Sequence, residues 1–201
     1  MGMCTDLIAV SRDVERHVCV EKEGVHLRRY YRFRLSRHYG GSAVGDVVGC
    51  NFNCVYCWCW RINRNLEIGS VYSPEAVVEN LLTLARSANY YILRLSGGEP
   101  TLCFNHLLQV LEHFSRARRD KEVFVLETNG FVLGLEKKLV EELARYRDLV
   151  VVRVSLKGCS EEEFSRLTGL DSSVYRYQLK ALENLDDHGI SYSIAVPISF
   201  C

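Results

Sequence analysis

Three cysteines lie close together in the 201-residue sequence, with the spacing Cys-x3-Cys-x2-Cys. They are Cys50, Cys54 and Cys57. Thiolates are soft ligands, and three of them on one short loop favour zinc or an iron–sulfur cluster. A cluster of four irons held by three cysteines leaves one iron without a protein ligand, and an open metal position can chelate a substrate. The spacing therefore predicts a reactive metal centre on this loop.

Two other interpretations of these cysteines stay open. Structural zinc needs four closed ligands, usually as two separated pairs, and the sequence has no second pair at such a spacing, although His38 and Cys59 could complete a set. Burial of the three cysteines as small hydrophobic residues fits poorly, because polar Asn51 and Asn53 lie among them. The odd total of nine cysteines fits intracellular thiolate ligands better than a secreted disulfide scaffold.

The elements that position this loop follow from the hydrophobic pattern. Short runs rich in Val, Ile and Leu are typical of strands buried on both faces, and we expect them at residues 43–48, 91–96, 123–127, 149–155 and 191–198. Helical patterns lie between them: after Ser73, over 105–118 and 136–147, after Ser160, and over 172–188 with Tyr175, Leu179, Leu182 and Leu185 on one stripe. Regular alternation of strands and helices predicts an α/β fold with a parallel sheet.

Polar or glycine-rich loops follow the first four of these strands. The carboxyl ends of parallel strands meet at one edge of a sheet, so these loops are expected to share one site. They comprise residues 49–57, 97–100 (GGEP), 127–130 (ETNG) and 155–158 (SLKG).

The cysteine motif, with Tyr56 before its last cysteine and GGEP after the next strand, resembles the radical S-adenosylmethionine (SAM) superfamily. The resemblance covers about residues 43–198, and ETNGF and SLKG further resemble its activating-enzyme branch. It implies a partial barrel of the (β/α)6 type, with residues 1–42 as an N-terminal appendage and 43–201 as the core domain. Only five core strands are visible, so the sixth is absent, or is borrowed from the appendage or from a partner.

The resemblance also implies a cofactor set and an activity. Cys50, Cys54 and Cys57 would hold a [4Fe–4S] cluster whose open iron binds SAM. The enzyme, of the oxidoreductase or activase type, would cleave SAM reductively to a 5′-deoxyadenosyl radical that abstracts hydrogen from an unidentified substrate. That substrate would include a partner protein activated by the abstraction. A flavodoxin- or ferredoxin-like protein would donate the electron. The alternative is a non-catalytic iron–sulfur subunit that serves in electron transfer or assembly.

The same resemblance implies which residues hold SAM. Backbone carbonyls of the glycines would face its amino group, Glu99 would contact that group or hold the loop, and the remaining residues would contact adenine, ribose or carboxylate. Lysine is a natural partner for a carboxylate. Two alternatives to SAM binding remain open: Lys157 would be an ordinary solvated lysine at a strand end, and ETNG would serve only as a turn. The expected SAM-binding residues are Tyr56, Gly97, Gly98, Glu99, Glu127, Asn129, Ser155, Lys157 and Val196.

Composition limits the remaining function classes. With 25 Lys and Arg against 25 Asp and Glu, overall charge makes no case for nucleic acid or membrane surfaces. No apolar run approaches the ~18 residues of a membrane span and no secretory signal is visible, so a cytoplasmic protein is expected. Residues 26–38 hold five arginines among aromatic residues, and we expect an amphipathic strand there rather than an RNA site; a surface for an anionic small substrate or a partner is the third interpretation. Cys59, Cys103 and Cys159 each follow a strand, and as functional thiols or ligands of a second cluster they form a minor alternative.

Overall fold

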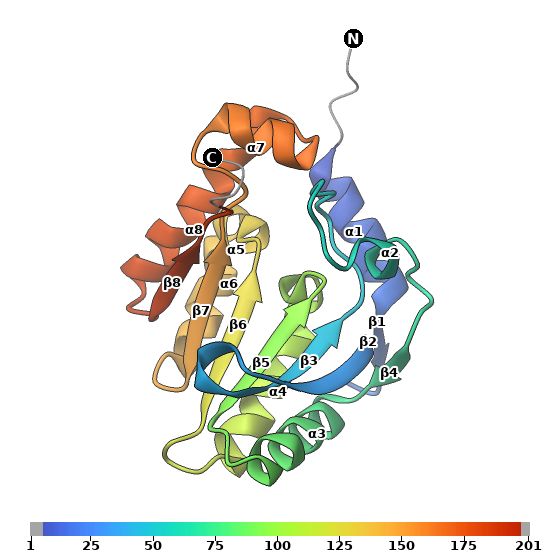
Figure 1. Cartoon of the computed structure of the whole chain (residues 1–201), viewed down its shortest axis with the longest axis vertical. Coiled ribbons are helices and arrows are strands. Elements are labelled where there is room, and N and C mark those ends of the chain that lie inside the picture. Colours follow the sequence, from blue (N-terminus) through green and yellow to red (C-terminus); the bar gives the residue numbers. More distant parts are fainter. Residues whose placement is uncertain (1–5, 198–201) are drawn as a thin grey trace.

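Eight strands form one sheet in the computed structural model, which describes residues 6–197. Neighbouring strands follow the order β1-β2-β3-β5-β6-β7-β8, and β4 pairs with β2 (Figure 1). The strands are β1 (Cys19–Lys22), β2 (Val25–Ser36), β3 (Ser42–Val47), β4 (Ser70–Tyr72), β5 (Ile92–Gly97), β6 (Val123–Thr128), β7 (Val150–Ser155) and β8 (Tyr192–Ala195).

Helices connect the core strands; in Figure 1, α4 and α6 lie behind the sheet, α3 lies below it and α8 lies beside β8. The α-helices are α1 (Leu7–Val18), α2 (Trp60–Asn63), α3 (Pro74–Ser87), α4 (Phe104–Ala117), α5 (Phe131–Leu135), α6 (Lys137–Leu143), α7 (Glu161–Thr168) and α8 (Tyr175–Asp187). Short 3-10 turns are η1 (His38–Gly40), η2 (Pro100–Cys103), η3 (Ala144–Tyr146) and η4 (Ser172–Val174). No helix within residues 6–197 combines the length and the apolar character that crossing a membrane requires.

The five predicted core strands form a parallel array, β3-β5-β6-β7-β8, which confirms the expected fold class. Four of them start and end within one residue of the predicted bounds. The last was predicted over 191–198, whereas β8 ends at Ala195 and residue 198 lies outside the described residues. All six residues of β3 are buried, as a strand covered on both faces should be.

The sheet stays open, as a partial barrel does. Within residues 6–197, β8 has β7 as its one neighbour, and the described chain adds no parallel strand beside it. The N-terminal residues extend the opposite edge instead: β2 pairs antiparallel with β3, with Phe33 opposite Gly45. Of the expected ways to place a sixth strand, the appendage therefore does join the sheet, but not at the position after β8.

Helix starts follow the capping signals. The Ser73 hydroxyl accepts a hydrogen bond from the nitrogen of Ala76 at 3.2 Å, and Pro74 occupies the first turn of α3. The Ser160 hydroxyl likewise accepts from the nitrogen of Glu163 at the start of α7. These side-chain bonds satisfy amide groups that have no partner inside the helix, and they fix where each helix begins.

The predicted stripe of α8 is wrong in part. Leu179 is 41% exposed, and the buried face holds Gln178, Ala181 and Asn184 beside Tyr175 and Leu185. A hydrophobic pattern alone favours the leucine stripe, but two amide side chains on the other face bind backbone carbonyls. Gln178 donates to Asn129 and Ser155 at the strand ends, and Asn184 donates to Leu133 in α5. These polar contacts accompany the observed rotation of the helix.

The N-terminal residues contain a helix that the strand-based prediction did not include. Asp6 caps α1, because its carboxylate accepts hydrogen bonds from the nitrogens of Ile8 and Ala9 at 3.0 and 3.2 Å. Leu7, Val14 and Val18 bury one face of α1 against the rest of the molecule. The spacing of these apolar residues over three turns is the sequence signal that reveals the helix.

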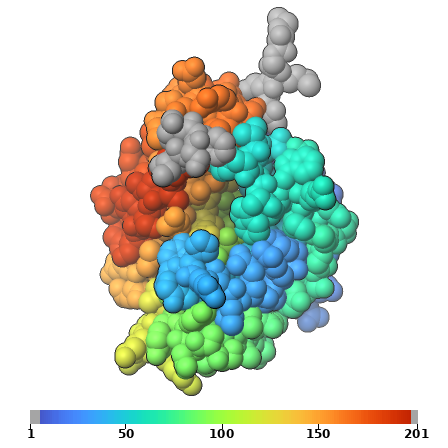
Figure 2. Space-filling model, in the orientation of Figure 1, coloured from blue at the N-terminus to red at the C-terminus, as the bar shows by residue number. Residues whose placement is uncertain are grey.

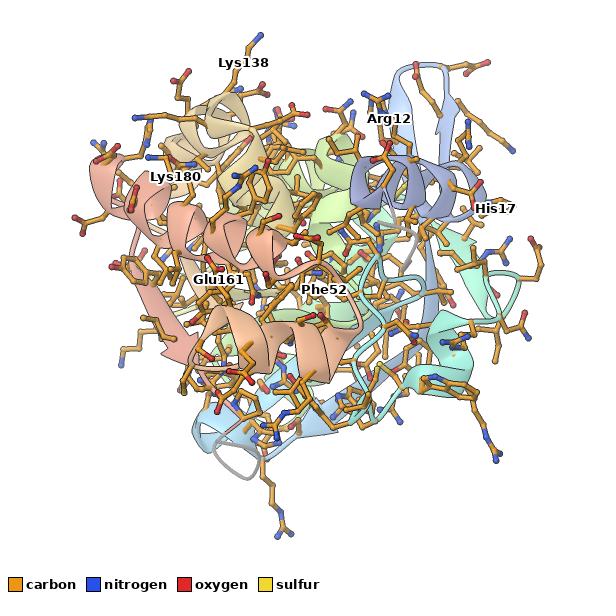
Figure 3. All side chains as sticks on the ribbon, turned by 90° about the horizontal axis from the view of Figure 1, so that it is seen from above. Arg12, His17, Phe52, Lys138, Glu161 and Lys180 are labelled. Atoms are coloured by element: carbon orange, nitrogen blue, oxygen red, sulfur yellow. A yellow bond between two sulfur atoms is a disulfide. The ribbon has the colours of Figure 1, made fainter. Side chains whose placement is uncertain are left out.

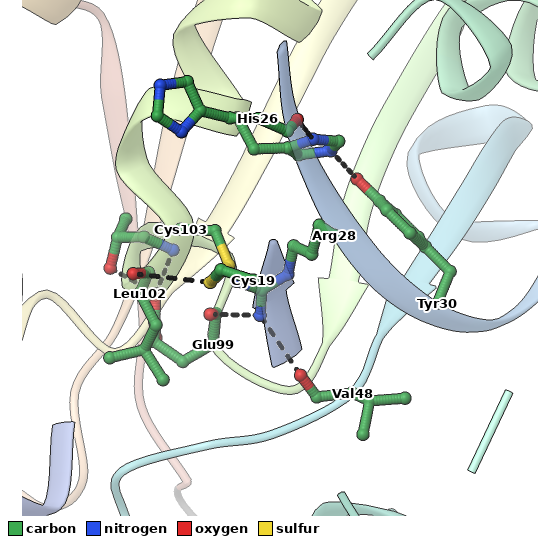
Figure 4. The surroundings of a disulfide bond; sticks show 10 residues. Cys19, His26, Arg28, Tyr30, Val48, Glu99, Leu102 and Cys103 are labelled. Carbon is green, nitrogen blue, oxygen red and sulfur yellow. Dashed lines mark hydrogen bonds between the residues drawn. A yellow bond between two sulfur atoms is a disulfide. The ribbon is translucent and has the colours of Figure 1, made fainter. Parts of the chain in front are cut away.

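Cys19 at the start of β1 and Cys103 at the end of η2 form a disulfide, with Cα atoms 5.9 Å apart (Figure 4). The minor alternative of Cys103 as a functional thiol or ligand of a second cluster is therefore wrong. The three cysteines in question do not converge: Cys59 lies beside Cys57, and Cys159 is exposed. A bond between residues 84 apart leaves no local signal in the sequence.

Candidate functional site

One pocket of about 160 Å³ collects almost all of the predicted site residues. It lies where β3, β5, β6 and β7 end, which is the edge that the parallel topology predicts. Val196 does not line it; this residue follows β8 and packs against the main apolar core. The pocket lining includes Cys50, Cys54, Tyr56, Cys57, Gly97, Gly98, Glu99, Glu127, Asn129, Ser155 and Lys157.

The cysteine loop is held by packing and by backbone bonds. Phe52, at its middle, lies with its ring 5.7 Å from the ring of Phe164 in α7 and 6.3 Å from that of Phe131 in α5. Figure 3 shows Phe52 toward the interior, whereas Lys138 and Lys180 point outward. The nitrogen of Val55 donates to the carbonyl of Leu167 at 2.9 Å. Contacts with helix α7 therefore fix the position of the cysteine loop relative to the carboxyl ends of the strands.

The three cysteines differ in the direction in which their surroundings shift the pKa of the thiol. Burial raises the pKa of Cys50, with the charge of Glu99 adding to it, and burial also raises the pKa of Cys54. A hydrogen bond from the Cys59 thiol, whose sulfur is 3.7 Å away, lowers the pKa of Cys57 to about 6. The positive charge of Lys157 acts on all three toward a lower pKa. Buried thiolates here need a compensating cation, which suits a metal ligand set.

Glycines bring the GGEP loop against the cysteine loop. A Cβ atom on Gly98 would stand 2.1 Å from the carbonyl oxygen of Gly49, far inside contact distance. Gly97 adopts a φ of +90°, a conformation that glycine accepts and other residues rarely do. The nitrogens of Gly98 and Glu99 then donate to the carbonyls of Val47 and Gly49, each at 2.8 Å. The two loops are therefore joined through their backbones.

Glu99 is 1% exposed, and its carboxylate holds loops. One oxygen accepts from the nitrogen and hydroxyl of Thr101 at 3.0 and 2.6 Å and from the hydroxyl of Thr128 at 2.7 Å. The other accepts from the nitrogen of Asn129 at 2.6 Å. Four donors on one buried carboxylate fix the end of β5 relative to the end of β6.

Glu127 and Asn129, on either side of Thr128, have separate partners. Glu127 accepts from the hydroxyls of Ser96 and Tyr39, both at 2.6 Å, and pairs with Arg94 at 3.1 Å. The Asn129 amide donates to the side-chain oxygen of Asn51 at 2.8 Å and lies 4.0 Å from the Cys50 sulfur. Asn129 is therefore part of the cysteine loop's support.

Lys157 supplies the positive charge of the pocket. Its ammonium donates to the hydroxyl of Ser155 at 2.7 Å, and no ion pair of Lys157 with a carboxylate occurs in the described part of the chain. A cation at the edge of a pocket, without an acidic partner, is available to an anionic group of a ligand.

Gln178 and Arg28 support the site and were not predicted. Fully buried Gln178 donates to the carbonyls of Asn129 and Ser155 and accepts from the nitrogen of Lys157. Arg28 donates to the carbonyls of Val48 and Glu99 at 3.2 and 2.9 Å (Figure 4), and burial lowers its pKa to about 10. Gln178 has a sequence signal, since it lies three residues after Tyr175 on the buried face of α8. Arg28 has none, because it looks like any strand arginine.

The donor set suits an iron–sulfur cluster, because thiolates are the ligands that such clusters use. Within residues 6–197, no group of three His, Cys, Asp or Glu side chains is arranged around one ion position. The three thiols of the cysteine loop line a common pocket together with a lysine, which is consistent with a multi-iron group of net negative charge.

Sequence comparison agrees with this fold and this donor set. The family model described as the Radical SAM superfamily matches residues 46–198, so the chain belongs to that superfamily. Superfamily members in general use a [4Fe–4S] cluster and SAM.

Three curated relatives illustrate the range of the family. The chain is 27% identical over 179 residues to the radical SAM cyclopropyl synthase TigE of Paramaledivibacter caminithermalis, covering 80% of this chain and 37% of that protein. It is 28% identical to a probable GTP 3',8-cyclase of Thermococcus kodakarensis, covering 69% and 41%. It is 32% identical to the UPF0026 protein slr1464 of Synechocystis, covering 56% and 41%. The chain thus spans about two fifths of the length of these relatives.

Proposed function

We propose that this protein binds a [4Fe–4S] cluster through Cys50, Cys54 and Cys57 and cleaves SAM reductively. The observation that carries the proposal is the common pocket: three thiols, the Gly97–Gly98 turn and a lysine that has no acidic partner among residues 6–197 meet at the carboxyl end of the sheet. When bound there, the cluster supplies an electron that splits the sulfonium of SAM into methionine and a 5′-deoxyadenosyl radical able to abstract hydrogen.

The chain's own residues would bind and orient SAM. The carbonyl oxygen of Gly97, 3.0 Å from the Cys59 sulfur, would face the ammonium group of SAM, since Gly97 lines the pocket. Lys157 would bind the carboxylate of SAM, and the hydroxyl of Ser155 would position the ammonium group of Lys157 for this contact. Tyr56 is proposed beside adenine, and Glu127 and Asn129 beside the ribose; Val196 does not line the pocket, so no contact with adenine is proposed for it. Glu99 acts by holding the loops that carry these groups.

The electron must come from outside the chain. As its source we propose a small flavodoxin- or ferredoxin-like protein, since a cluster at the mouth of an open sheet is within reach of a docked donor. The hydrogen donor, whether a small molecule or a partner protein, is the substrate.

The test is anaerobic reconstitution with iron and sulfide, followed by Mössbauer spectroscopy and a SAM-cleavage assay. A brown protein with a cubane signal that forms 5′-deoxyadenosine under reduction supports the proposal. A colourless, zinc-loaded product contradicts it, and a cluster without SAM cleavage identifies an electron-transfer or assembly subunit instead.

Cys54→Ala should abolish both the cubane signal and SAM cleavage, because a cluster on two cysteines loses a corner ligand. The control is Cys159→Ala, since Cys159 is exposed and takes no part in the pocket. Retention of cluster and activity in Cys54→Ala would refute the ligand assignment.

A further inference from the structure

A second pocket, of about 580 Å³, adjoins the first and is rich in arginine. We call it the arginine pocket; it is lined by Arg32, Arg34, Arg94 and Arg153, together with the aromatic residues Tyr39 and Trp58. It shares Trp58, Ser96 and Glu127 with the first pocket, the one that Cys50, Cys54 and Cys57 line. Figure 2 shows the molecule hollowed on this face, between the N-terminal segment, the cysteine loop and the C-terminal strands.

Strand register brings these arginines together from separate parts of the chain. Arg32 and Arg34 are two residues apart on β2, so they share one face of that strand. Arg32 is the register partner of Asp46 in β3, and Arg153 in β7 is the partner of Glu127 in β6. The pocket therefore exists only because β2 has joined the sheet beside β3.

The acids at this pocket do not balance its arginines. Asp46 is fully buried and accepts from the Nε atoms of Arg32 and Arg34 at 2.5 and 2.7 Å. Glu127 pairs with Arg94 at 3.1 Å.

Arg153 is the unpaired member. No ion pair or hydrogen bond of Arg153 occurs among the residues that the structure describes, and its guanidinium lies 5.7 Å from the ring of Tyr39. Four guanidinium groups thus face two carboxylates, an excess of two positive charges in a chain whose net charge is zero. Such an excess in a hollow attracts anions.

The aromatic residues add a flat wall. Trp58 is 64% exposed, and its ring lies 5.5 Å from the guanidinium of Arg32 and 6.0 Å from that of Arg34. Exposed aromatic surface beside fixed cations is suited to a ligand with a flat or apolar body and charged ends.

A nucleic-acid surface fits these residues less well. The basic stretch of β2 is divided, because Arg28 is buried and Arg29 donates to the carbonyls of Glu67 and Gly69. Two of these arginines, Arg28 and Arg29, therefore serve the fold. The arginines left for a ligand line one hollow rather than a continuous basic strip along the strand. The volume is that of a small-molecule site.

We propose that the arginine pocket binds the substrate, and that this substrate is a small organic dianion, a dicarboxylate or a phosphate monoester. The assignment rests on the proposed function for its chemistry, because Trp58, Ser96 and Glu127 place the ligand next to the SAM site. Binding itself requires only the residues of this pocket.

The test is isothermal titration of the anaerobically reconstituted protein with succinate and with glycerol 3-phosphate, each at millimolar concentration. Binding of either supports the proposal and tells which oxyanion the pocket prefers. Failure of both to bind overturns it, as does binding of a single-stranded RNA or an acidic peptide in their place.

Arg153→Gln should weaken dianion binding about tenfold or more, because it removes a charge-assisted hydrogen bond. Arg153→Lys keeps the charge and should therefore retain part of the affinity. Partial binding by this variant would show that the loss in Arg153→Gln comes from the missing charge and not from a folding defect. The matched control is Arg145→Gln, in which the lost guanidinium lies 5.8 Å from the ring of Tyr146 on the outer layer. Equal affinities in Arg153→Gln and wild type would refute the site.

SAM cleavage by the wild-type protein, measured in parallel, separates the two proposals. Dianion binding that depends on Arg153 without any SAM cleavage would leave the pocket standing and overturn the proposed function. SAM cleavage without dianion binding would support the proposed function and overturn the assignment of the arginine pocket.

Discussion

The carboxylate of Glu99 accepts a hydrogen bond from the backbone nitrogen of Asn129 at 2.6 Å, across 30 residues of sequence. This bond joins the loop after β5 to the loop after β6, and Asn129 in turn reaches Asn51 in the cysteine loop. Gln178 extends the same chain of contacts to Ser155 at the end of β7. Four loops are thereby fixed to one another before any cofactor is considered.

Glu99→Gln should lower the free energy of unfolding by about 2–4 kcal/mol, because an amide nitrogen would face backbone and hydroxyl donors at a buried position. Guanidinium unfolding followed by circular dichroism measures the change. Glu79→Gln is the control, since Glu79 is exposed in the middle of α3, and it should stay within about 0.5 kcal/mol of wild type. Equal stability of the two variants would contradict the role given to Glu99.

Gly98→Ala should reduce both stability, by about 1–3 kcal/mol, and the iron bound on reconstitution, because its methyl group would displace the backbone of Gly49 next to Cys50. Gly169→Ala provides a comparison: Gly169 has a φ of +72° but meets no atom within 4 Å. That variant should lose stability and keep its iron. Normal iron content in Gly98→Ala would show that the loop contact is not needed for the cluster.

His106 predicts a pH dependence of stability. Its Nδ1 lies 2.6 Å from the carbonyl of His26 and must donate, so its Nε2 accepts from the Tyr30 hydroxyl at 2.9 Å. Burial lowers the pKa of His106 to about 3, against 6.5 for the ordinary side chain. Between these values the unfolded chain binds the proton more tightly, so stability is complete above pH 6.5 and falls on acidification.

The expected slope from this one group is about 1.4 kcal/mol per pH unit within that window. Urea unfolding at several pH values from 6.5 downward measures it, and His106→Gln should flatten the curve. The control is His113→Gln, on the same helix and outside the Tyr30–His26 bridge. A wild-type slope that His106→Gln leaves unchanged would show that another group is responsible.

The disulfide predicts a redox dependence of stability. Reduction of Cys19–Cys103 should lower the free energy of unfolding by about 2–4 kcal/mol, because the bond closes a loop of 84 residues. Cys103→Ser should behave as the reduced protein does, and Cys159→Ser should not. Mass spectrometry after alkylation of the air-oxidised protein provides the direct check: an alkylated Cys19 would contradict the bond.

The sequence by itself determined the layout of the core and almost all of the residues that line the pocket at its edge. Strand and helix alternation, serine caps and the four loops at strand ends are local patterns. The structure contains each of them, because the interactions that produce them act within a few residues. The spacing of Cys50, Cys54 and Cys57 is local in the same sense. Even the missed α1 had a local signal in Asp6 and its apolar spacing.

Only the tertiary structure decided which residues hold the site together. Gln178 reaches Asn129 across 49 residues, Arg28 reaches Glu99 across 71, and Cys19 bonds to Cys103 across 84. The arginine pocket needs four strands in one register. Such contacts depend on where distant segments come to lie, and hydrophobic periodicity, which specifies faces but not partners, carries no information about them.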